Sequence, residues 1–415
     1  MNYLDRHAYY PQKLFDKPND NLGIVVVIPA FCEPLLLESL ISIKKCDQPI
    51  CSVEVIVVIN HSIEADELTK TTSIQMIRQA QQWIDNNNEE KLKFHIIEAF
   101  DFPQKIAGVG LARKVGMDEA VRRFQKVDNA KGIICCFDAD SCCDKNYLTA
   151  TEDHFKNNPK TTACSIYFEH PLKGEEFSTE IYTGILNYEL HLRYYIAGLR
   201  YANHPFAYHT IGSSMAVRSN VYQKQGGMNK KKAGEDFYFL HKIIPLGNFS
   251  ELNTTKVIPS PRPSERVPFG TGRAINSWLN NKNEHFLTYD PKVFQEMKSF
   301  LEQVDFFYLP SSLIQLSEPV NLFLKSCDFE EKLKEIKGNC KDLTSFQKRF
   351  YIWFDGFKAM KFIHFMRENY YSNINISQAT QTLLNQILLK EQKNTDLNTI
   401  LENFRKMDFS IKKGY

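Results

Sequence analysis

The sequence predicts an α/β domain with a mostly parallel β-sheet flanked by helices, followed by an α-helical C-terminal region. In roughly the first 170 residues, short apolar runs alternate with longer segments in which apolar residues recur at helical spacing. Beyond Ser277 the helical patterns continue, while strand-like runs are hard to find. These two observations predict two domains, residues 1–276 and residues 277–415.

Four apolar, β-branched runs are the predicted strands. A strand that helices cover on both faces is a nearly continuous apolar run, and these segments consist mainly of apolar residues. They occupy residues 24–28, 54–59, 94–97 and 132–137, and helical patterns at residues 35–43, 65–85 and 109–124 separate them. This alternation is typical of a parallel sheet with helices on both faces.

The later predicted helices are rich in aromatic residues. In the segment 177–201, such residues are typical of core or domain packing, and less often of a sugar-binding platform. The C-terminal helices are predicted at residues 293–306, 329–336, 346–366 and 376–389. The tail from Phe404 to Lys413 mixes apolar and basic residues. A docked terminal helix is favoured there, with contact to a membrane surface as the alternative.

Composition limits the class of protein. Of 415 residues, 43% are apolar and 24% are charged, which is typical of a packed globular protein. The net charge of +2 gives no general reason to expect nucleic acid as a partner. No apolar run approaches the roughly 20 residues that span a bilayer, and we expect no transmembrane segment or signal peptide.

The chain contains ten cysteines and no Cys-x-x-Cys pair. We interpret the cysteines as reduced thiols of a cytoplasmic protein, several of them in the core. A metal-binding role for Cys142 and Cys143 is the less favoured alternative, because the doublet lacks the spacing of a zinc site.

Two carboxylates, Asp138 and Asp140, directly follow the apolar run 132–137. The carboxyl ends of strands in open α/β sheets form the edge at which ligands bind. Carboxylate oxygens suit Mg²⁺ or Mn²⁺, which usually also bind substrate phosphates. The alternative is a solvated turn, since Asp and Ser are common turn residues.

Several motifs, in order, resemble the family-2 glycosyltransferases of the GT-A fold across residues ~22–275. Residues 28–33 (Ile-Pro-Ala-Phe-Cys-Glu) resemble the family's Pro-x-aromatic-x-Glu, and residues 57–62 lie where it commonly has Val-Val-Asp-Asp-Gly-Ser. Residues 108–116 resemble its Gly-rich helix start, and Asp138-Ala139-Asp140 matches its metal-binding Asp-x-Asp. The acceptor half is matched by residues 212–218, Gly226-Gly227 and Glu235-Asp236. The helical half from Ser277 onward is almost uncovered.

The resemblance implies that Pro29, Glu33 and Asn60 lie at the nucleotide. Glu33 would approach the ribose or base, although a helix N-terminal acid favoured by the dipole explains it equally well. Asn60 replaces an Asp that usually accepts a hydrogen bond from uracil. Asn can donate or accept, so the choice between a uridine and a guanosine carrier stays open.

Two basic groups are implied at the donor diphosphate. Arg113 and Lys114 lie near a helix start, which favours phosphate, and the alternative is an exposed basic helix face. Arg262 and Arg266 belong to the Pro- and Gly-rich segment 260–273. Related enzymes often have a mobile loop here that closes over the nucleotide, and the alternative is a linker between domains.

The metal and catalytic residues follow from the same resemblance. Asp140 is expected to bind metal directly, while Asp138 contacts ribose, water or the metal. Asp236 is the expected general base and Glu235 is the second candidate, with an ordinary acidic helix start as the alternative. No third metal ligand is evident, and His209 and His241 are weak candidates for it.

These residues predict a glycosyltransferase. Inversion is favoured, because Asp236 fits a base and no nucleophile motif is evident. It would move a sugar from a nucleoside-diphosphate sugar to a hydroxyl of a sugar, lipid-linked sugar or small molecule, with Mn²⁺ or Mg²⁺. A sugar-nucleotide nucleotidyltransferase is one alternative, but it would need a Gly-rich loop after the first strand, and residues 29–33 contain no glycine. A non-catalytic carbohydrate- or nucleotide-binding protein is the other.

Overall fold

The computed structural model describes residues 2–265, 270–280, 285–309, 314–390 and 395–410. Its described residues form two compact units. The first contains residues up to 182 together with residues 210–276, and the second contains residues 183–209 and 277–410. Residues 183–209 therefore group with the helical unit, whereas the sequence-based division at residue 276 placed them in the first domain.

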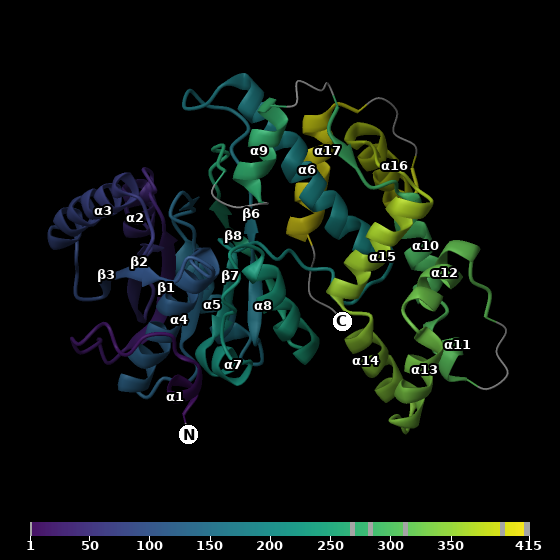
Figure 1. Ribbon diagram of the computed structural model, residues 1–415, viewed down its shortest axis with the longest axis horizontal. Helices are drawn as coiled ribbons and strands as arrows, with labels where there is room; N and C mark the ends of the chain where they lie inside the picture. The colour runs from purple at the N-terminus through teal and green to yellow at the C-terminus, as the bar shows by residue number, and fades with distance from the viewer. Residues whose placement is uncertain (1, 266–269, 281–284, 310–313, 391–394, 411–415) are drawn as a thin grey trace. The chain divides into compact units, whose positions relative to one another are not determined.

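The first unit is built on a sheet of eight strands in the order β3-β2-β1-β4-β7-β6-β8-β5 (Figure 1). The strands are β1 Leu22–Ala30, β2 Ser52–Ser62, β3 Leu92–Phe102, β4 Ile133–Cys136, β5 Cys142–Cys143, β6 Ala163–Phe168, β7 Met215–Arg218 and β8 Ser250–Ile258. Strands β3, β2, β1 and β4 are parallel, and β6 is parallel to β8. The predicted fold class, a mostly parallel sheet with flanking helices and a helical C-terminal region, is confirmed.

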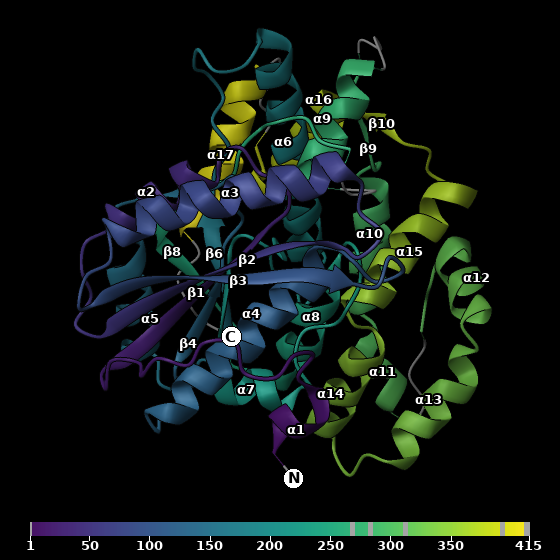
Figure 2. The same cartoon turned by 60° about the vertical axis from the view of Figure 1, so that its left-hand side comes forward.

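Helices cover both faces of the parallel half of this sheet (Figure 2). Helices α2 Leu36–Lys44 and α3 Glu67–Asp85 lie on one face, and α4 Val109–Lys126 lies on the other. The approach of α4 depends on Gly116, because a Cβ there would lie 2.4 Å from Cγ1 of Val27. The other helices of this unit are α1 Tyr3–His7, α5 Tyr147–Asn157, α7 Ser219–Lys224, α8 Glu235–Ile243 and the 3₁₀ helix Ile244–Leu246.

The four predicted strands coincide with β1 to β4, but the antiparallel part of the sheet was not predicted. Strand β7 is antiparallel to both β4 and β6, and β5 is antiparallel to β8. Strand β7 has only four residues, and β8 contains the polar run Asn253-Thr254-Thr255. Such strands lack the long apolar run by which a fully covered strand is recognised.

The N-terminal segment, residues 2–16, lies along α4, and we call it the N-terminal strap. Glu119 of α4 accepts hydrogen bonds from the backbone NH groups of Lys13 and Leu14, both at 3.1 Å. Arg122 donates to the carbonyl oxygen of Tyr10 at 2.6 Å. Charged residues of α4 thus form hydrogen bonds with backbone groups of the strap. These bonds explain how a helix with many charged residues can be largely buried.

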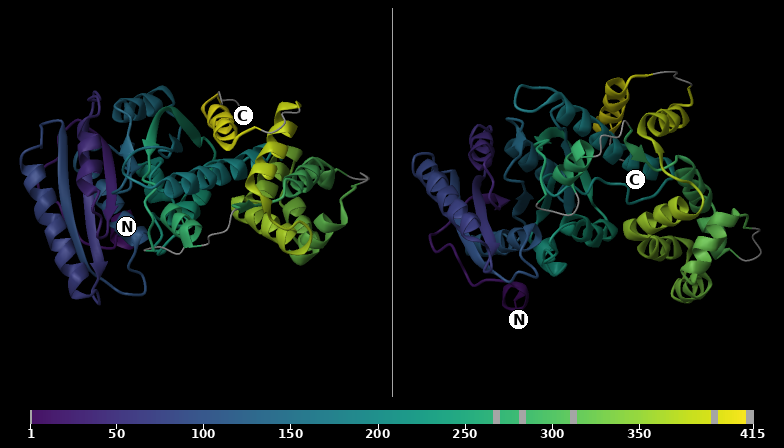
Figure 3. Two further views of the ribbon diagram at one scale, coloured as in Figure 1. Left: turned by 90° about the horizontal axis from the view of Figure 1, so that it is seen from above. Right: turned by 45° about the horizontal axis from the view of Figure 1, so that its top comes forward.

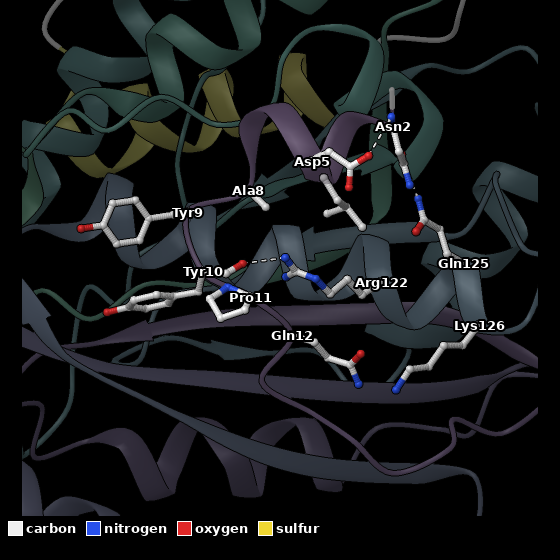
Figure 4. A pocket seen from close by; sticks show the side chains of 11 residues that line it. Asn2, Asp5, Ala8, Tyr9, Tyr10, Pro11, Gln12, Arg122, Gln125 and Lys126 are labelled. Atoms are coloured by element: carbon white, nitrogen blue, oxygen red, sulfur yellow. Dashed lines mark hydrogen bonds between the residues drawn. The ribbon is translucent and has the colours of Figure 1, made fainter.

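A cavity of about 620 Å³ lies between the N-terminal strap and α4 (Figure 4). Tyr10 and Gln12 of the strap line it together with Arg122 and Lys126 of α4. Its lining contains none of the residues that the sequence assigned to a site.

The second unit is helical (Figure 3). Its helices are α10 Lys292–Leu301, α11 Val304–Tyr308, α12 Glu318–Ser326, α13 Phe329–Gly338, α14 Leu343–Trp353, α15 Gly356–Asn369, α16 Ile376–Leu388 and α17 Leu397–Ser410, with the short strands β9 Leu287–Thr288 and β10 Ile374–Asn375. Helices α6 Thr179–Tyr201 and α9 Thr271–Asn280 each have residues in both units.

Within the second unit, two predicted helices are each divided in two, 293–306 into α10 and α11 and 346–366 into α14 and α15, and the terminal helix is docked. The prediction of a single helix over residues 346–366 was wrong, because Asp355 accepts a hydrogen bond from the backbone NH of Lys358 and starts α15 separately from α14. In α17, Phe404 is buried and Asp408 pairs with Arg193 of α6. Among the described residues, no helix is long and apolar enough to cross a membrane.

Candidate active site

Polar side chains gather where the parallel strands end. Glu33 follows β1, Asn60 lies near the end of β2, and Asp138 follows β4. The register is parallel, with Ala30 opposite Ile59 and Val27 opposite Cys136, so all three side chains come to the same edge of the sheet. This is the edge at which open α/β sheets bind ligands.

The turn after β1 places Glu33 inside the protein. Cys32 has φ of +45°, a left-handed conformation that side-chain-bearing residues rarely adopt. One Glu33 carboxylate oxygen accepts from the backbone NH of Leu35 at 3.2 Å, and the other accepts from Arg262 at 2.5 Å. Glu33 therefore has a role at the start of α2 and also joins an ion pair with a distant segment.

Arg262 links two of the predicted site residues. Its Nη2 lies 2.5 Å from Oε2 of Glu33 and 3.9 Å from Oδ2 of Asp140. The arginine comes from the segment after β8 and is 23% exposed, whereas the Glu33 side chain is only 4% exposed. We call Arg262, Glu33 and Asp140 the outer group.

Arg113 links the other carboxylates and is 1% exposed. It donates to Oδ1 of Asp138 at 2.6 Å and forms an ion pair with Glu235. Burial lowers the pKa of Arg113, but the charges of Glu235 and Asp138 outweigh it and hold that pKa above its ordinary value. The guanidinium is thus a permanent cation, and we call Arg113, Asp138, Glu235 and Asp236 the inner group.

Glu235 and Asp236 begin α8 after Gly234, which has φ of +68°. Burial raises the pKa of Glu235 to about 7; Arg113 opposes this increase and Asp236 adds to it. Burial also raises the pKa of Asp236, again against the effect of Arg113. Asp236 accepts from the backbone NH of Phe237 at 2.7 Å. Glu235 can therefore hold or release a proton near neutral pH.

Two glycines hold the inner group together. A Cβ on Gly212 would lie 2.8 Å from Nη1 of Arg113 and 3.0 Å from Oδ2 of Asp236. A Cβ on Gly110 would lie 2.3 Å from the carbonyl oxygen of Lys231 and 2.9 Å from Cβ of Glu235. Gly110, in the first turn of α4, therefore leaves room for the segment that leads into Glu235.

The other predicted residues lie apart from these contacts. Asn60 is buried and donates to the carbonyl oxygen of Ala30 at 3.0 Å, and Pro29 is opposite Val58 within the sheet. Lys114 lies 3.1 Å from Asp118 and donates to the hydroxyl of Tyr3 at 3.2 Å. The structure therefore directs Lys114 toward the N-terminal strap, not toward the carboxylates that contact Arg113.

The remaining predictions cannot be joined to the site. Arg266 lies outside the described residues. His209 belongs to the second unit, where its Nε2 is 3.1 Å from Asp408. His241 lies beside Phe237, with ring centroids 4.2 Å apart.

The donor set at Asp138 and Asp140 fits a hard divalent cation. The side chains are 39% and 28% exposed, respectively, and both offer carboxylate oxygens. Among the described residues, no group of three or more His, Cys, Asp or Glu side chains is arranged to hold a metal ion. Mg²⁺ needs no such group, because it is commonly held by one or two carboxylates together with substrate phosphates and water.

Sequence reasoning missed that Arg113 pairs with two protein carboxylates. It also missed the left-handed turn at Cys32 and the N-terminal strap. The available signal was charge: Asp118, Glu119 and Arg123 interrupt the apolar spacing of α4, and buried charges need partners.

No protein-family model matches the sequence, and a search of curated proteins found no match. Solved structures show a loose likeness. S. aureus TarS 1-349 in complex with UDP-GlcNAc has a TM-score of 0.39 and 16% identity, covering 70% of this chain and 76% of that chain. The mannosyltransferase PcManGT from Pyrobaculum calidifontis, in complex with GDP-Man and Mn²⁺, has a TM-score of 0.36 and 15% identity, covering 98% and 92%. At these TM-scores the likeness supports no conclusion about function.

Proposed function

We propose that this protein is a metal-dependent glycosyltransferase that moves a sugar from a nucleoside-diphosphate sugar to an acceptor hydroxyl with inversion. The observation that carries the proposal is the inner group. One buried guanidinium joins Asp138, from the Asp-x-Asp motif, to Glu235, from the acidic pair of α8. Two motifs separated by about a hundred residues of chain are therefore linked by one side chain, which supports a donor site next to an acceptor site.

The outer group supplies the donor side of the proposed reaction. Arg262 provides a guanidinium suited to phosphate oxygens, and Asp140 provides a metal ligand. A divalent cation held by Asp140 and Asp138 would neutralise charge on the departing diphosphate. Glu33 and Asn60, at the ends of the neighbouring strands, lie where the nucleoside is expected, and the base stays unassigned.

The inner group supplies the acceptor side. The acceptor oxygen attacks the anomeric carbon, the bond from that carbon to the diphosphate oxygen breaks, and Asp236 takes the hydroxyl proton. A single displacement inverts the anomeric centre. Glu235 forms an ion pair with Arg113, so we assign Glu235 a positioning role. Asp236, which lies beside Gly212, is assigned the role of the base.

The test uses the full-length chain with a panel of UDP- and GDP-sugars, each with Mn²⁺ or with a chelator. We expect at least one nucleotide sugar to raise the unfolding temperature in a metal-dependent way, since a ligand of the native state stabilises it. We also expect release of the nucleoside diphosphate on addition of a hydroxyl acceptor. The absence of stabilisation by every nucleotide sugar, with and without metal, would contradict the proposal.

A further inference from the structure

Two cysteine sulfurs in the first unit lie in contact. Cys46 lies two residues after the end of α2, Cys143 lies in β5, and their Sγ atoms are 3.6 Å apart. Cys46 is 5% exposed and Cys143 is partly exposed. Both are free thiols in the structure. The residues are far apart in sequence, so the fold creates this pair.

The backbone around the two thiols is already held on both sides. The backbone NH of Cys143 donates to Oγ of Ser42 in α2 at 2.9 Å. One residue beyond Cys46, the NH of Asp47 donates to the carbonyl oxygen of Lys145 at 2.7 Å. The end of α2 and the chain around β5 thus lie side by side, and joining the sulfurs does not require distant segments to move together.

We propose that Cys46 and Cys143 form a redox modification site that closes to an intramolecular disulfide under a two-electron oxidant such as hydrogen peroxide. One thiolate attacks a peroxide oxygen, the O–O bond breaks, and a sulfenic acid forms while the hydroxide that leaves takes up the proton lost by the thiol and becomes water. The second thiol attacks that sulfur, the S–S bond forms, and the sulfenic oxygen leaves as a second water. The two sulfurs are oxidised and the peroxide is reduced.

The geometry requires a small contraction. The sulfurs must approach from 3.6 Å to the disulfide length of about 2.05 Å. The hydrogen bond with Cys46, together with burial, raises the pKa of the Cys143 thiol. Because the thiolate is the reactive form, closure is expected to be slow at neutral pH and faster as pH rises.

The position of the pair connects it to the outer group. Asp140 lies three residues before Cys143, and β5 pairs with the end of β8, where Cys142 is opposite Ile258. The segment after β8 carries Arg262. The disulfide would therefore tie α2 to the segment that positions the donor ligands. If the proposed function is correct, oxidation should reduce the metal-dependent stabilisation of the protein by the nucleotide sugar.

The test is peptide mapping of the full-length chain under non-reducing conditions after treatment with hydrogen peroxide. We expect one cross-linked species that joins the peptides of Cys46 and Cys143, and its loss after dithiothreitol. Cys46→Ser and Cys143→Ser should each abolish it, while the matched control Cys142→Ser should retain it. Circular dichroism checks that each variant is folded.

A second measurement keeps the proposal testable if a variant does not fold. Differential alkylation of the oxidised wild-type chain should show that Cys46 and Cys143 become protected together, while the other thiols still react after denaturation. A cross-link through Cys142, or over-oxidation of one sulfur without any cross-link, would overturn the assignment. The mapping is independent of transferase activity, so a cross-link in a protein that binds no nucleotide sugar would contradict the proposed function alone.

Discussion

The inner and outer groups are built alike and differ in burial. Each contains one arginine that contacts carboxylates from separate segments. Arg113 is 1% exposed and Arg262 is 23% exposed. A buried ion pair is costly to break, because removal of one partner leaves a charge without compensation, whereas a partly exposed pair can exchange partners with solvent or a ligand. The comparison indicates that the inner group is a fixed framework and the outer group is exchangeable.

The largest expected effect comes from removing the buried cation. Arg113→Leu should lower the free energy of unfolding by about 3–5 kcal/mol, because Glu235, which is 4% exposed, loses its partner in a buried setting. Urea denaturation followed by circular dichroism measures it. Arg262→Leu is the matched control and should cost clearly less. Equal losses for the two variants would remove the distinction between the groups.

Variants of Glu235 and Asp236 should show which of the two residues is the general base and which has the positioning role. Asp236→Asn is expected to keep donor affinity and to lose about 100-fold or more in turnover, the lower end of what general acid–base catalysis contributes. Steady-state kinetics with the active donor measure it. If Glu235→Gln is the slow variant and Asp236→Asn is nearly normal, the two roles are reversed.

The outer group should be sensitive to the shape of its cation and to its metal ligand. Arg262→Lys keeps the charge but loses the planar fork that can pair with phosphate, so donor use, measured by steady-state kinetics, should fall roughly tenfold with little change in folding. Normal donor use by Arg262→Lys would show that Arg262 forms its ion pair in the ligand-free protein but has no role in donor binding.

Asp140→Asn should remove the metal dependence of nucleotide binding, measured as the shift in unfolding temperature that the nucleotide sugar causes with and without Mn²⁺.

A further expected effect is a pH dependence of stability that belongs to the inner group. The folded-state pKa of Glu235 is about 7, above its ordinary value of 4.5. Between these values the folded state binds the proton and the unfolded state does not, so this group makes stability fall as pH rises from about 4.5 to about 7 and has no further effect above that. Glu235→Gln should flatten this part of the curve of urea midpoint against pH.

An unchanged slope in Glu235→Gln would assign the titration to other groups. Arg262→Leu provides the matched comparison in the outer group and should leave the slope in place.

The sequence predicted the parallel half of the sheet because its strands contain runs of mainly apolar residues. Residues 24–28 and 54–59 were recognisable without any tertiary information. The motif positions also placed Asp138, Asp140, Glu235 and Arg262 among the candidates. The structure brings these residues into the inner and outer groups, while their chemical roles stay predictions.

The rest depended on partners that sequence spacing does not reveal. Arg113 and Lys114 are consecutive, yet residues one apart on a helix point in directions about 100° apart, so one meets Asp138 and the other meets Asp118. Glu119 pairs with backbone groups of Lys13 and Leu14, which only folding brings near it. Short strands such as β7 are likewise defined by their neighbours.

The division into two units has a spectroscopic consequence. The chain contains three tryptophans: Trp83 belongs to the first unit, and Trp278 and Trp353 belong to the second. Trp83 packs edge-on against Phe94 of β3, with ring centroids 5.1 Å apart. In a Trp83→Phe variant, the emission comes from the helical unit alone, and in a Trp278→Phe/Trp353→Phe variant it comes from the sheet unit alone. Intrinsic fluorescence can thus follow the melting of each half of the chain separately.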